Sequence, residues 1–318
     1  MALALRALMP RLPEGTPVVV GLGLHRPMTA AELAPLAPWS PAQHDPDDVV
    51  PTATVDGVPG EIWRGAAEVD QILSVGVAEL HQYAGLSGGH KGVAVGLGGR
   101  ATISTLHARD RVLAPGVRLG QLDGNPFRAA VDALGEAARC LAALVWIPSA
   151  RRWAFGPPTA VLRAASALIQ PWVPCDRTYA GAVLHVPAAK ASSLYQASRA
   201  ATYLALSPRP PLEEGATLVL HAACPEGLGA EAGWVAALTG SPPPWEALLT
   251  GPEPRGPGAQ RAVMLALLAR RYRLKIAGCV DPRPFTQVGL RATTAPPPEG
   301  PAWLQVTHPF DHIPQRAG

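Results

Sequence analysis

The stretch Gly85-Leu86-Ser87-Gly88-Gly89-His90-Lys91 follows an apolar run at residues 71–77 and ends on one of only three lysines in the chain. A buried apolar strand that runs into a loop rich in glycine is typical of α/β folds. Because the 27 Lys and Arg residues are nearly all arginine, a retained lysine indicates a task that guanidinium cannot perform. An ε-amine can lose its proton and attack an electrophile, whereas arginine stays protonated. We therefore interpret Lys91 as a residue kept for amine chemistry.

The same succession of strand and loop occurs nearer the N-terminus. The apolar residues 18–20 predict a buried strand, which runs into Gly21-Leu22-Gly23-Leu24-His25. Thr29 and Glu32 then have the spacing of a capping box, which predicts the start of a helix. His25 is thus expected at the carboxyl end of a strand, the edge at which open α/β sheets bind ligands.

Three histidines, His25, His81 and His107, share one predicted domain with Lys91. His81 lies ten positions before Lys91, and His107 lies sixteen positions after it. Imidazoles can exchange protons with a substrate or bind a metal, and an amine can tether a cofactor. Two acid/base histidines, a metal ligand and a tether would suit an epimerising site, but the residue types alone do not assign these roles.

Strand and helix patterns continue through the second half of the chain. They predict strands at 181–186, 217–221 and 276–280 and helices at 126–144, 192–206 and 260–274. Asn125 as cap and Pro126 at the first position mark the start of the first of these helices. We expect an α/β fold of two domains, each with a mainly parallel sheet flanked by helices, and an active site in the cleft between them. Prolines bracket a crossing between domains at 157–174, so the expected domains are a cofactor and catalytic domain, 1–160, and an α/β domain that closes over the site, 161–318.

Composition argues against several classes of protein. The net charge of +3 is small, and no run of Lys and Arg is interleaved with aromatic residues, so no nucleic-acid partner is expected. No apolar run reaches the ~18 residues of a membrane span, and the first residues lack the apolar core of a signal peptide. The four cysteines form no CxxC pair, which predicts reduced thiols. The expectation is a cytoplasmic protein without a membrane partner.

Two nucleotide-binding patterns are weaker alternatives. A phosphate loop of the form GxxxxGK[ST] fails, because His90 stands where the second glycine is needed and Gly92 follows Lys91. The run Gly96-Leu97-Gly98-Gly99-Arg100-Ala101 resembles a dinucleotide fingerprint, and it leaves open a nicotinamide-dependent oxidoreductase. That pattern needs a preceding strand and a later acidic residue, and the acidic residue is not evident.

Motifs along most of the chain closely resemble those of the nickel-pincer lactate racemase family in order, spacing and residue type. In the first domain they are His25-Arg26-Pro27-Met28-Thr29, Glu79-Leu80-His81 leading into 85–91, residues 99–103 up to His107, and Asp123-Gly124-Asn125-Pro126. In the second they are Tyr195-Gln196-Ala197-Ser198-Arg199 and Cys224-Pro225-Glu226-Gly227-Leu228-Gly229. The resemblance covers residues 17–288, and its loop signature is far more specific than any single glycine motif.

The resemblance implies an isomerase, namely a racemase or epimerase of lactate-like 2-hydroxy acids that carries a nickel pincer nucleotide. This cofactor is a pyridinium mononucleotide, pyridinium-3,5-bisthiocarboxylic acid mononucleotide, whose sulfur and carbon atoms hold nickel. By resemblance, Lys91 would bind it covalently in a loop that includes Ser87, Gly88 and Gly89, and His107 would be the remaining nickel ligand. The partners implied are a small 2-hydroxy acid substrate and the enzymes that make the pincer.

The resemblance also assigns the chemistry. His25 and His81 would be the paired acid/base groups, one removing the hydroxyl proton while hydride moves to the cofactor and then returns to the other face. Tyr195, Gln196 and Arg199 would bind the substrate and its carboxylate.

Two departures from the family pattern lead to an alternative. Arg199 stands where the family has lysine, a change that keeps the charge. The family pattern also includes a segment before the His25 motif that supplies an arginine for the substrate and groups for the cofactor phosphate. Arg6 and Arg11 stand in no matching motif, so we expect part of this segment to be missing. The alternative is therefore a non-catalytic homologue of the same fold that binds a ligand or the cofactor.

Overall fold

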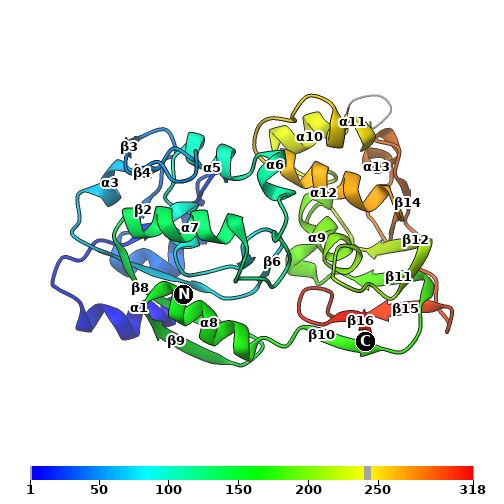
Figure 1. Ribbon diagram of the computed structural model, residues 1–318, viewed down its shortest axis with the longest axis horizontal. Coiled ribbons are helices and arrows are strands. Elements are labelled where there is room, and N and C mark those ends of the chain that lie inside the picture. The colour runs from blue at the N-terminus through cyan, green and yellow to red at the C-terminus, as the bar shows by residue number, and fades with distance from the viewer. Residues whose placement is uncertain (1, 240–244, 318) are drawn as a thin grey trace. The chain divides into compact units, whose positions relative to one another are not determined.

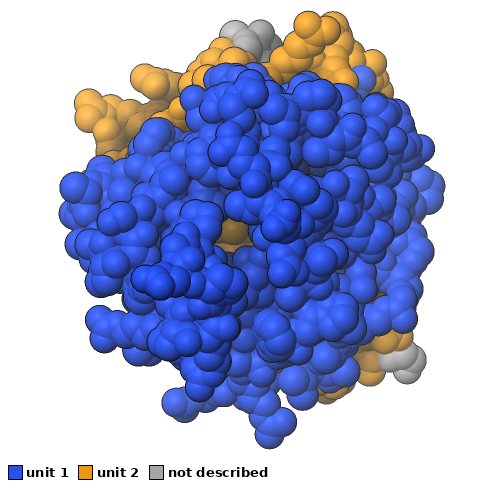
Figure 2. Space-filling view, turned by 90° about the vertical axis from the view of Figure 1, so that its left-hand side faces the viewer, with its two compact units in different colours: residues 1–169 blue, residues 170–318 orange. Residues whose placement is uncertain are grey.

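The computed structural model describes residues 2–239 and 245–317. It divides the chain into two compact units, Met1–Ile169 and Gln170–Gly318, which Figure 2 colours separately. Each unit contains parallel strand pairs and helices, as the mixed α/β class requires (Figure 1). In neither described range is any helix long and apolar enough to cross a membrane.

The division between the units lies later in the chain than the expected boundary between residues 160 and 161. That position falls inside helix α8 (Pro158–Leu168). One side of α8, with Val161, Leu162 and Ala165, is buried, and the helix packs against strands of the first unit. Apolar burial on that side is the physical reason that α8 stays with the first unit.

The sheet of the first unit has three strands. β5 (Ile72–Val77) pairs in parallel with β8 (Cys140–Ile147), which pairs antiparallel with β9 (Arg152–Gly156). Shorter pairs surround it: β1 (Val19–Val20) with β2 (Ala42–Gln43) in parallel, and the antiparallel pairs β3 (Val49–Pro51) with β4 (Glu61–Trp63) and β6 (Leu80–His81) with β7 (Gly85–Leu86). The strands predicted before His25 and before the glycine-rich loop are therefore present.

The helices of the first unit are mostly short. They are α1 (Ala2–Leu8), α2 (Ala30–Leu33), α3 (Arg64–Ala67), α4 (Lys91–Ala94), α5 (Arg100–Leu106), α6 (Arg109–Val112), α7 (Pro126–Ala137) and α8, with 3₁₀ turns at Met9–Arg11 and Ala34–Trp39. The capping box predicted at the start of α2 is formed by Thr29 and Glu32. Asn125 caps α7 by accepting a hydrogen bond from the Arg128 amide, as its position before Pro126 predicted.

The helix predicted over 126–144 ends at Ala137, so its second part was wrong. Arg139 has a left-handed backbone conformation, with φ of 59°, and this turn ends the helix. Cys140 then begins β8, the central strand of the sheet. A short apolar run such as this one fits a buried strand as well as a helix, which explains the error.

The second unit contains an open sheet of five strands that are all parallel. In chain order they are β11 (Tyr179–His185), β12 (Leu212–His221), β13 (Arg273–Ala277), β14 (Arg291–Thr293) and β15 (Trp303–Val306). Their spatial order is β14-β13-β12-β11-β15. The helices are α9 (Leu194–Ala205), α10 (Ala232–Leu238), α11 (Trp245–Thr250), α12 (Ala259–Ala269) and α13 (Arg283–Gln287), with a 3₁₀ turn at Ala188–Lys190. A separate parallel pair joins β10 (Trp172–Cys175) to β16 (Ile313–Arg316).

Candidate active site

The glycine-rich loop keeps its shape because glycine is needed at three of its positions. Gly85, Gly88 and Gly89 have φ angles of 72°, 85° and 58°, a region that other residues rarely adopt. A Cβ on Gly85 would lie 2.1 Å from the Gln121 carbonyl oxygen, and one on Gly89 would lie 2.9 Å from the Leu162 side chain. The loop is thus packed closely against its surroundings. Whether Gly88 and Gly89 also bind a cofactor stays a prediction.

Ser87 closes this loop onto the end of β5. Its hydroxyl donates to the Val77 carbonyl at 2.7 Å and accepts from the Glu79 amide at 3.0 Å. Its own amide donates to the Glu79 carbonyl at 2.9 Å. These bonds fix the chain between the strand and Lys91, so the structure gives Ser87 a task in holding the loop in addition to the predicted cofactor contact.

His90 anchors the start of α4 from the interior. Its ring is buried, with Nδ1 3.1 Å from an Asp132 carboxylate oxygen and Nε2 3.2 Å from the Cys140 carbonyl oxygen. A Cβ on Gly135 would lie 2.5 Å from the His90 Cβ, so glycine leaves the room that this side chain occupies. Lys91 is the next residue and the first of α4, and its backbone is therefore held in place.

His81 has one ring nitrogen engaged by the backbone. Its Nδ1 accepts hydrogen bonds from the amides of Tyr83 at 3.3 Å and Ala84 at 3.1 Å. A nitrogen that accepts from N–H groups carries no proton, so the proton of the neutral ring lies on Nε2. The tight turn after β6 thereby determines which tautomer His81 adopts.

The ring of Tyr83 contacts both His81 and His107. Its ring makes edge-to-face contacts with both imidazoles, at centroid distances of 5.6 Å to His81 and 5.8 Å to His107. Phe127, on α7, completes the cluster at 5.8 Å from Tyr83 and 5.3 Å from His107. Tyr83 and Phe127 are both buried. Two of the predicted site histidines are therefore brought to a single aromatic ring that the sequence did not single out.

His107 has the proton arrangement of a metal ligand. It follows the last residue of α5, and its Nδ1 lies 2.8 Å from the Ile103 carbonyl oxygen. Because a carbonyl only accepts, Nδ1 carries the proton and Nε2 carries the lone pair. Histidine ligands of metals commonly hold their second nitrogen in this way. Within the described residues no three His, Cys, Asp or Glu side chains form a metal site of their own.

His25 lies on an exposed loop that backbone hydrogen bonds connect to helix α4. The Gly23 amide donates to the Gly96 carbonyl at 3.0 Å, and the Gly96 amide donates to the Lys91 carbonyl at 3.2 Å. His25 itself is exposed, and its amide donates to the Leu22 carbonyl at 3.0 Å. Two backbone hydrogen bonds, both through Gly96, therefore connect the His25 loop to Lys91 at the start of α4.

The residue after His25 clamps this loop to α2. Arg26 makes two hydrogen bonds of 2.8 Å to the two carboxylate oxygens of Glu32. The Arg26 guanidinium, together with the Thr29 amide and hydroxyl, lowers the pKa of Glu32 to about 2. Glu32 therefore stays ionised, and the clamp persists, at ordinary pH.

The dinucleotide alternative lacks its structural premise. The fingerprint requires a strand that ends at the first glycine. Gly96 instead follows helix α4, and its amide bonds to the Lys91 carbonyl of that helix. The short apolar stretch before Gly96 is the end of that helix and its C-cap, Val95, and not a strand.

The predicted substrate residues lie on α9 of the second unit. Gln196 and Arg199 are half-buried one turn apart, and the Arg199 guanidinium donates to the Gln196 side-chain oxygen. Tyr195 is buried, with its ring 5.7 Å from that of Trp234 and the Arg261 guanidinium 4.8 Å from its centre. Of the three predicted substrate residues, Gln196 and Arg199 are thus joined by a side-chain hydrogen bond. Tyr195 instead packs into the interior of the second unit.

Phe310 gathers positive charge close to Arg199. The Lys190 ammonium lies 4.6 Å from the Phe310 ring centre, and the Arg199 guanidinium lies 5.7 Å from it. Two cations over one aromatic ring produce a positive potential that suits an anion. The sequence offered one signal for this cluster, since Lys190 is another of the three retained lysines.

Comparison with known protein families finds a match within the first unit. Residues 3–120 match the model of the lactate racemase N-terminal domain. This part of the chain is therefore similar to the lactate racemase N-terminal domain. The matched residues include His25, His81, Lys91 and His107, so the four candidates of the first unit all lie inside this domain.

A curated lactate racemase from Lactiplantibacillus plantarum is 30% identical to the chain over 120 residues. The match covers 34% of this chain and 28% of that protein. The chain thus matches less than a third of the length of this lactate racemase. The candidate residues of α9 lie outside the family model, so their roles stay predictions.

Two solved structures match the fold of nearly the whole chain. The lactate racemase apoprotein from Thermoanaerobacterium thermosaccharolyticum gives a TM-score of 0.82 at 16% identity, over 99% of this chain and 83% of that one. A Thermotoga maritima protein gives 0.68 at 14% identity, over 98% and 88% of the two chains. At such identities these matches show the fold, and they extend it to the second unit.

Proposed function

We propose that the protein is a racemase or epimerase of 2-hydroxy acids that works with a covalently bound nickel pincer nucleotide. The observation that carries the proposal is the environment of His81 and His107 inside the lactate racemase domain. Both rings contact Tyr83, and backbone groups determine the proton position on each. One ring would serve proton exchange and the other metal binding.

The donor set fits the proposed group. His107 would bind nickel through Nε2, the nitrogen that its bond to Ile103 leaves unprotonated. Imidazole is a suitable nickel ligand, and a single protein ligand is enough when the pincer supplies sulfur and carbon donors. Lys91 would be the covalent tether, positioned by His90 and by its place at the start of α4. When bound, the pincer nucleotide would accept hydride from the substrate and return it.

Proton exchange at His81 would involve its backbone partners. The neutral ring carries its proton on Nε2 because Nδ1 accepts from the Tyr83 and Ala84 amides. To take a substrate hydroxyl proton at Nε2, the ring must carry its other proton on Nδ1, which would then face two N–H donors. The turn 82–84 must therefore shift as His81 changes state. His25 would serve the opposite enantiomer from its exposed loop.

The second unit would supply the substrate's carboxylate site. Arg199 carries a permanent positive charge on a side chain already oriented by Gln196. Lys190 adds a second cation over the same Phe310 ring. A 2-hydroxy acid is an anion at neutral pH, so this pair would attract and orient it.

The proposal is tested by loading the protein with its cofactor. The protein would be co-expressed with pincer-biosynthesis enzymes, and its intact mass, nickel content and 2-hydroxy acid racemisation would be measured. We expect the wild type to gain mass and nickel. Lys91→Arg keeps the charge but removes the nucleophilic amine, so it should gain neither. Lys275→Arg, on β13, is the matched control and should load fully.

The outcomes separate the proposal from its alternative. Loading that survives Lys91→Arg would disprove the tether. Full loading of the wild type without racemisation of any 2-hydroxy acid tried would favour the non-catalytic homologue. His81→Gln should load and lose turnover, which would assign the proton exchange separately from cofactor binding.

A further inference from the structure

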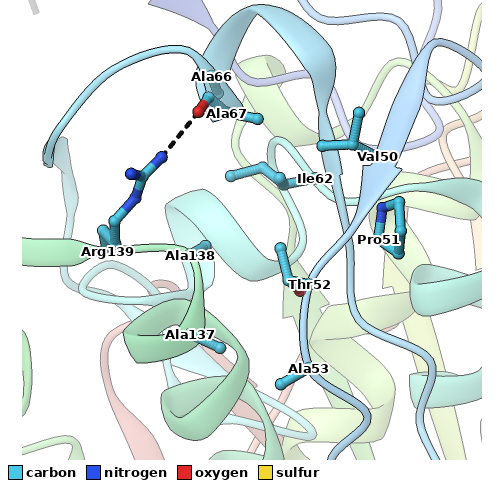
Figure 3. Close-up of a pocket in the computed structure, with 10 residues that line it drawn as sticks. All are labelled: Val50, Pro51, Thr52, Ala53, Ile62, Ala66, Ala67, Ala137, Ala138 and Arg139. Atoms are coloured by element: carbon cyan, nitrogen blue, oxygen red, sulfur yellow. Dashed lines mark hydrogen bonds between the residues drawn. The ribbon is translucent and has the colours of Figure 1, made fainter.

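The first unit contains a cavity of about 540 Å³ that the proposed reaction does not use (Figure 3). We name it the alanine cavity after its most frequent lining residue. It lies among strands β3 and β4, helix α3 and the end of α7. Its lining residues are Val50, Pro51, Thr52, Ala53, Ile62, Ala66, Ala67, Ala137, Ala138 and Arg139. This volume lies within the range of small-molecule sites.

The lining is apolar apart from Thr52 and Arg139. Five of its ten residues are alanine, and such short side chains leave the space that larger ones would fill. Ile62, Ala66 and Ala138 also belong to the core cluster that includes Val93 of α4. An apolar ligand here would continue the packing of that core, and burial of its surface would favour binding.

Arg139 is the single charged residue of the lining. It occupies the left-handed position after α7, where glycine is usual because other residues meet a steric penalty. Its guanidinium reaches from the end of α7 to the end of α3, where Nη2 donates to the Ala67 carbonyl at 2.7 Å (Figure 3). A residue kept in an unfavourable conformation points to a role for its side chain.

We infer that the alanine cavity binds a small monocarboxylate with an apolar body, with Arg139 as the partner of the carboxylate. The cavity supplies the two features that such a ligand needs: an apolar wall and one cation with no acidic residue among the lining. Guanidinium has a fork of donors, so Arg139 can keep its bond to Ala67 and present its remaining N–H groups to an anion. The inference does not depend on the proposed function.

The test compares two probes of the same chain length, one with an anionic head group and the other with a neutral one. Octanoate and octanamide have the same apolar chain, and their binding to the full chain, without nickel cofactor, would be measured by calorimetry and by ligand-observed NMR. We expect saturable octanoate binding that is at least about tenfold tighter than octanamide binding, because a charge-assisted hydrogen bond is stronger than a neutral one. No octanoate binding, or equal affinity for both probes, would overturn the inference.

Two variants locate the site. Arg139→Gly removes the guanidinium and suits the left-handed backbone, so it should abolish the preference for octanoate over octanamide. Arg151→Gly is the matched control, because Arg151 also has a positive φ, of 50°, but does not line the cavity. It should bind both probes as the wild type does. Equal losses in the two variants would also contradict the inference.

A third variant tests the volume. Ala137 lines the alanine cavity from an exposed position, so Ala137→Leu should fold normally while filling part of the space. We expect it to weaken octanoate and octanamide binding by a similar factor, because it removes room for the shared chain. Unchanged binding of both probes in Ala137→Leu would place the site elsewhere and overturn the inference. Since no measurement involves Lys91, failure here would leave the racemase proposal intact.

Discussion

Burial raises the pKa of the Cys140 thiol and the Cys224 thiol to about 12 each. The thiolate is the reactive form, so both should resist alkylation in the folded protein at mildly alkaline pH. Cys279 is also buried, and burial raises its pKa too, whereas Cys175 is partly exposed. We expect iodoacetamide to label Cys175 first and the other three only on unfolding, as mapped by peptide mass. Rapid labelling of Cys140 in folded protein would contradict this.

A second prediction at the scale of single residues concerns the clamp next to His25. Arg26→Gln removes the main cause of the low pKa of Glu32, which should rise from about 2 toward its ordinary value of 4.5. A carboxyl group whose pKa is lowered by folding stabilises the folded protein at pH values above its unfolded pKa. That stabilisation is lost as the pH falls through about 2, so the clamp should weaken only in strong acid. An NMR titration of the Glu32 carboxyl checks this. Arg64→Gln, which breaks the separate pair with Asp48, should leave Glu32 unchanged.

The candidate site residues of the first unit were chosen from the sequence, and their roles stay predictions. Spacing and type singled out His25, His81, Lys91 and His107, and all lie in the matched family domain. Tyr83 could not be found in this way, because a buried tyrosine in a loop has no periodic signal. Its role depends on packing between residues brought together by the fold, which no local pattern encodes.

At the scale of elements, Asn125 does more than cap α7. Its side-chain oxygen accepts from the Arg128 amide at 3.1 Å, and its side-chain nitrogen donates to the carbonyls of Tyr83 at 2.8 Å and Gln121 at 2.9 Å. Asn125→Ala loses all three bonds and should lower the free energy of unfolding by about 1–3 kcal/mol. Asn125→Ser keeps the cap and should lose less.

Denaturant unfolding measures both Asn125 variants. Ser193→Ala is the control, because Ser193 caps α9 through a single longer bond of 3.5 Å. Its cost should fall at the low end of the same range. A cost for Asn125→Ala no greater than that of Ser193→Ala would show that the bonds to Tyr83 and Gln121 add nothing to stability.

Helices that begin with a capping residue could be predicted from the sequence, whereas the strand β8, which depends on distant residues, could not. The caps of α2 and α7 were predicted because Thr29 and Asn125 act through neighbours close in sequence. β8 was missed because its pairing with β5 joins residues some seventy positions apart, such as Ile72 and Cys140. Long-range pairing of this kind decides between helix and strand where a short apolar run fits both.

At the scale of the whole molecule, one histidine in each unit ties stability to pH: the buried His44 in the first and the half-buried His221 in the second. Burial lowers the pKa of His44 in the first unit and of His221 in the second, where His185 contributes as well. A histidine whose pKa is lower in the folded state binds more protons when unfolded, so stability is full above its ordinary value of 6.5 and declines as pH falls below it. We expect the free energy of unfolding to fall between pH about 7.5 and about 5.5.

Variants assign this pH dependence to its units. His44→Gln should flatten the pH dependence of unfolding in the first unit, and His221→Gln should do so in the second. Because the chain has two compact units, unfolding should be followed by tryptophan fluorescence and by hydrogen exchange, which resolves the units separately. A pH dependence that survives both substitutions would assign it to other groups.

The sequence predicted the organisation of the molecule in two units only in part. Alternating strands and helices indicated α/β structure in both halves, and the fold comparisons confirm that class. The boundary was placed between residues 160 and 161, inside the stretch 157–174 that prolines bracket, although burial of Val161 and Leu162 ties α8 to the first unit. Proline density marks where a chain turns, whereas apolar burial decides which unit a helix joins.

The contact of Tyr83 with two imidazoles makes it a built-in spectroscopic reporter. Its ring contacts both His81 and His107, and its amide donates to His81 Nδ1. A fluorine atom introduced on this ring would therefore report on both proposals, nickel binding at His107 and a change of charge on His81. One NMR resonance would then record the order in which loading and protonation occur, on a protein that has turned over no substrate.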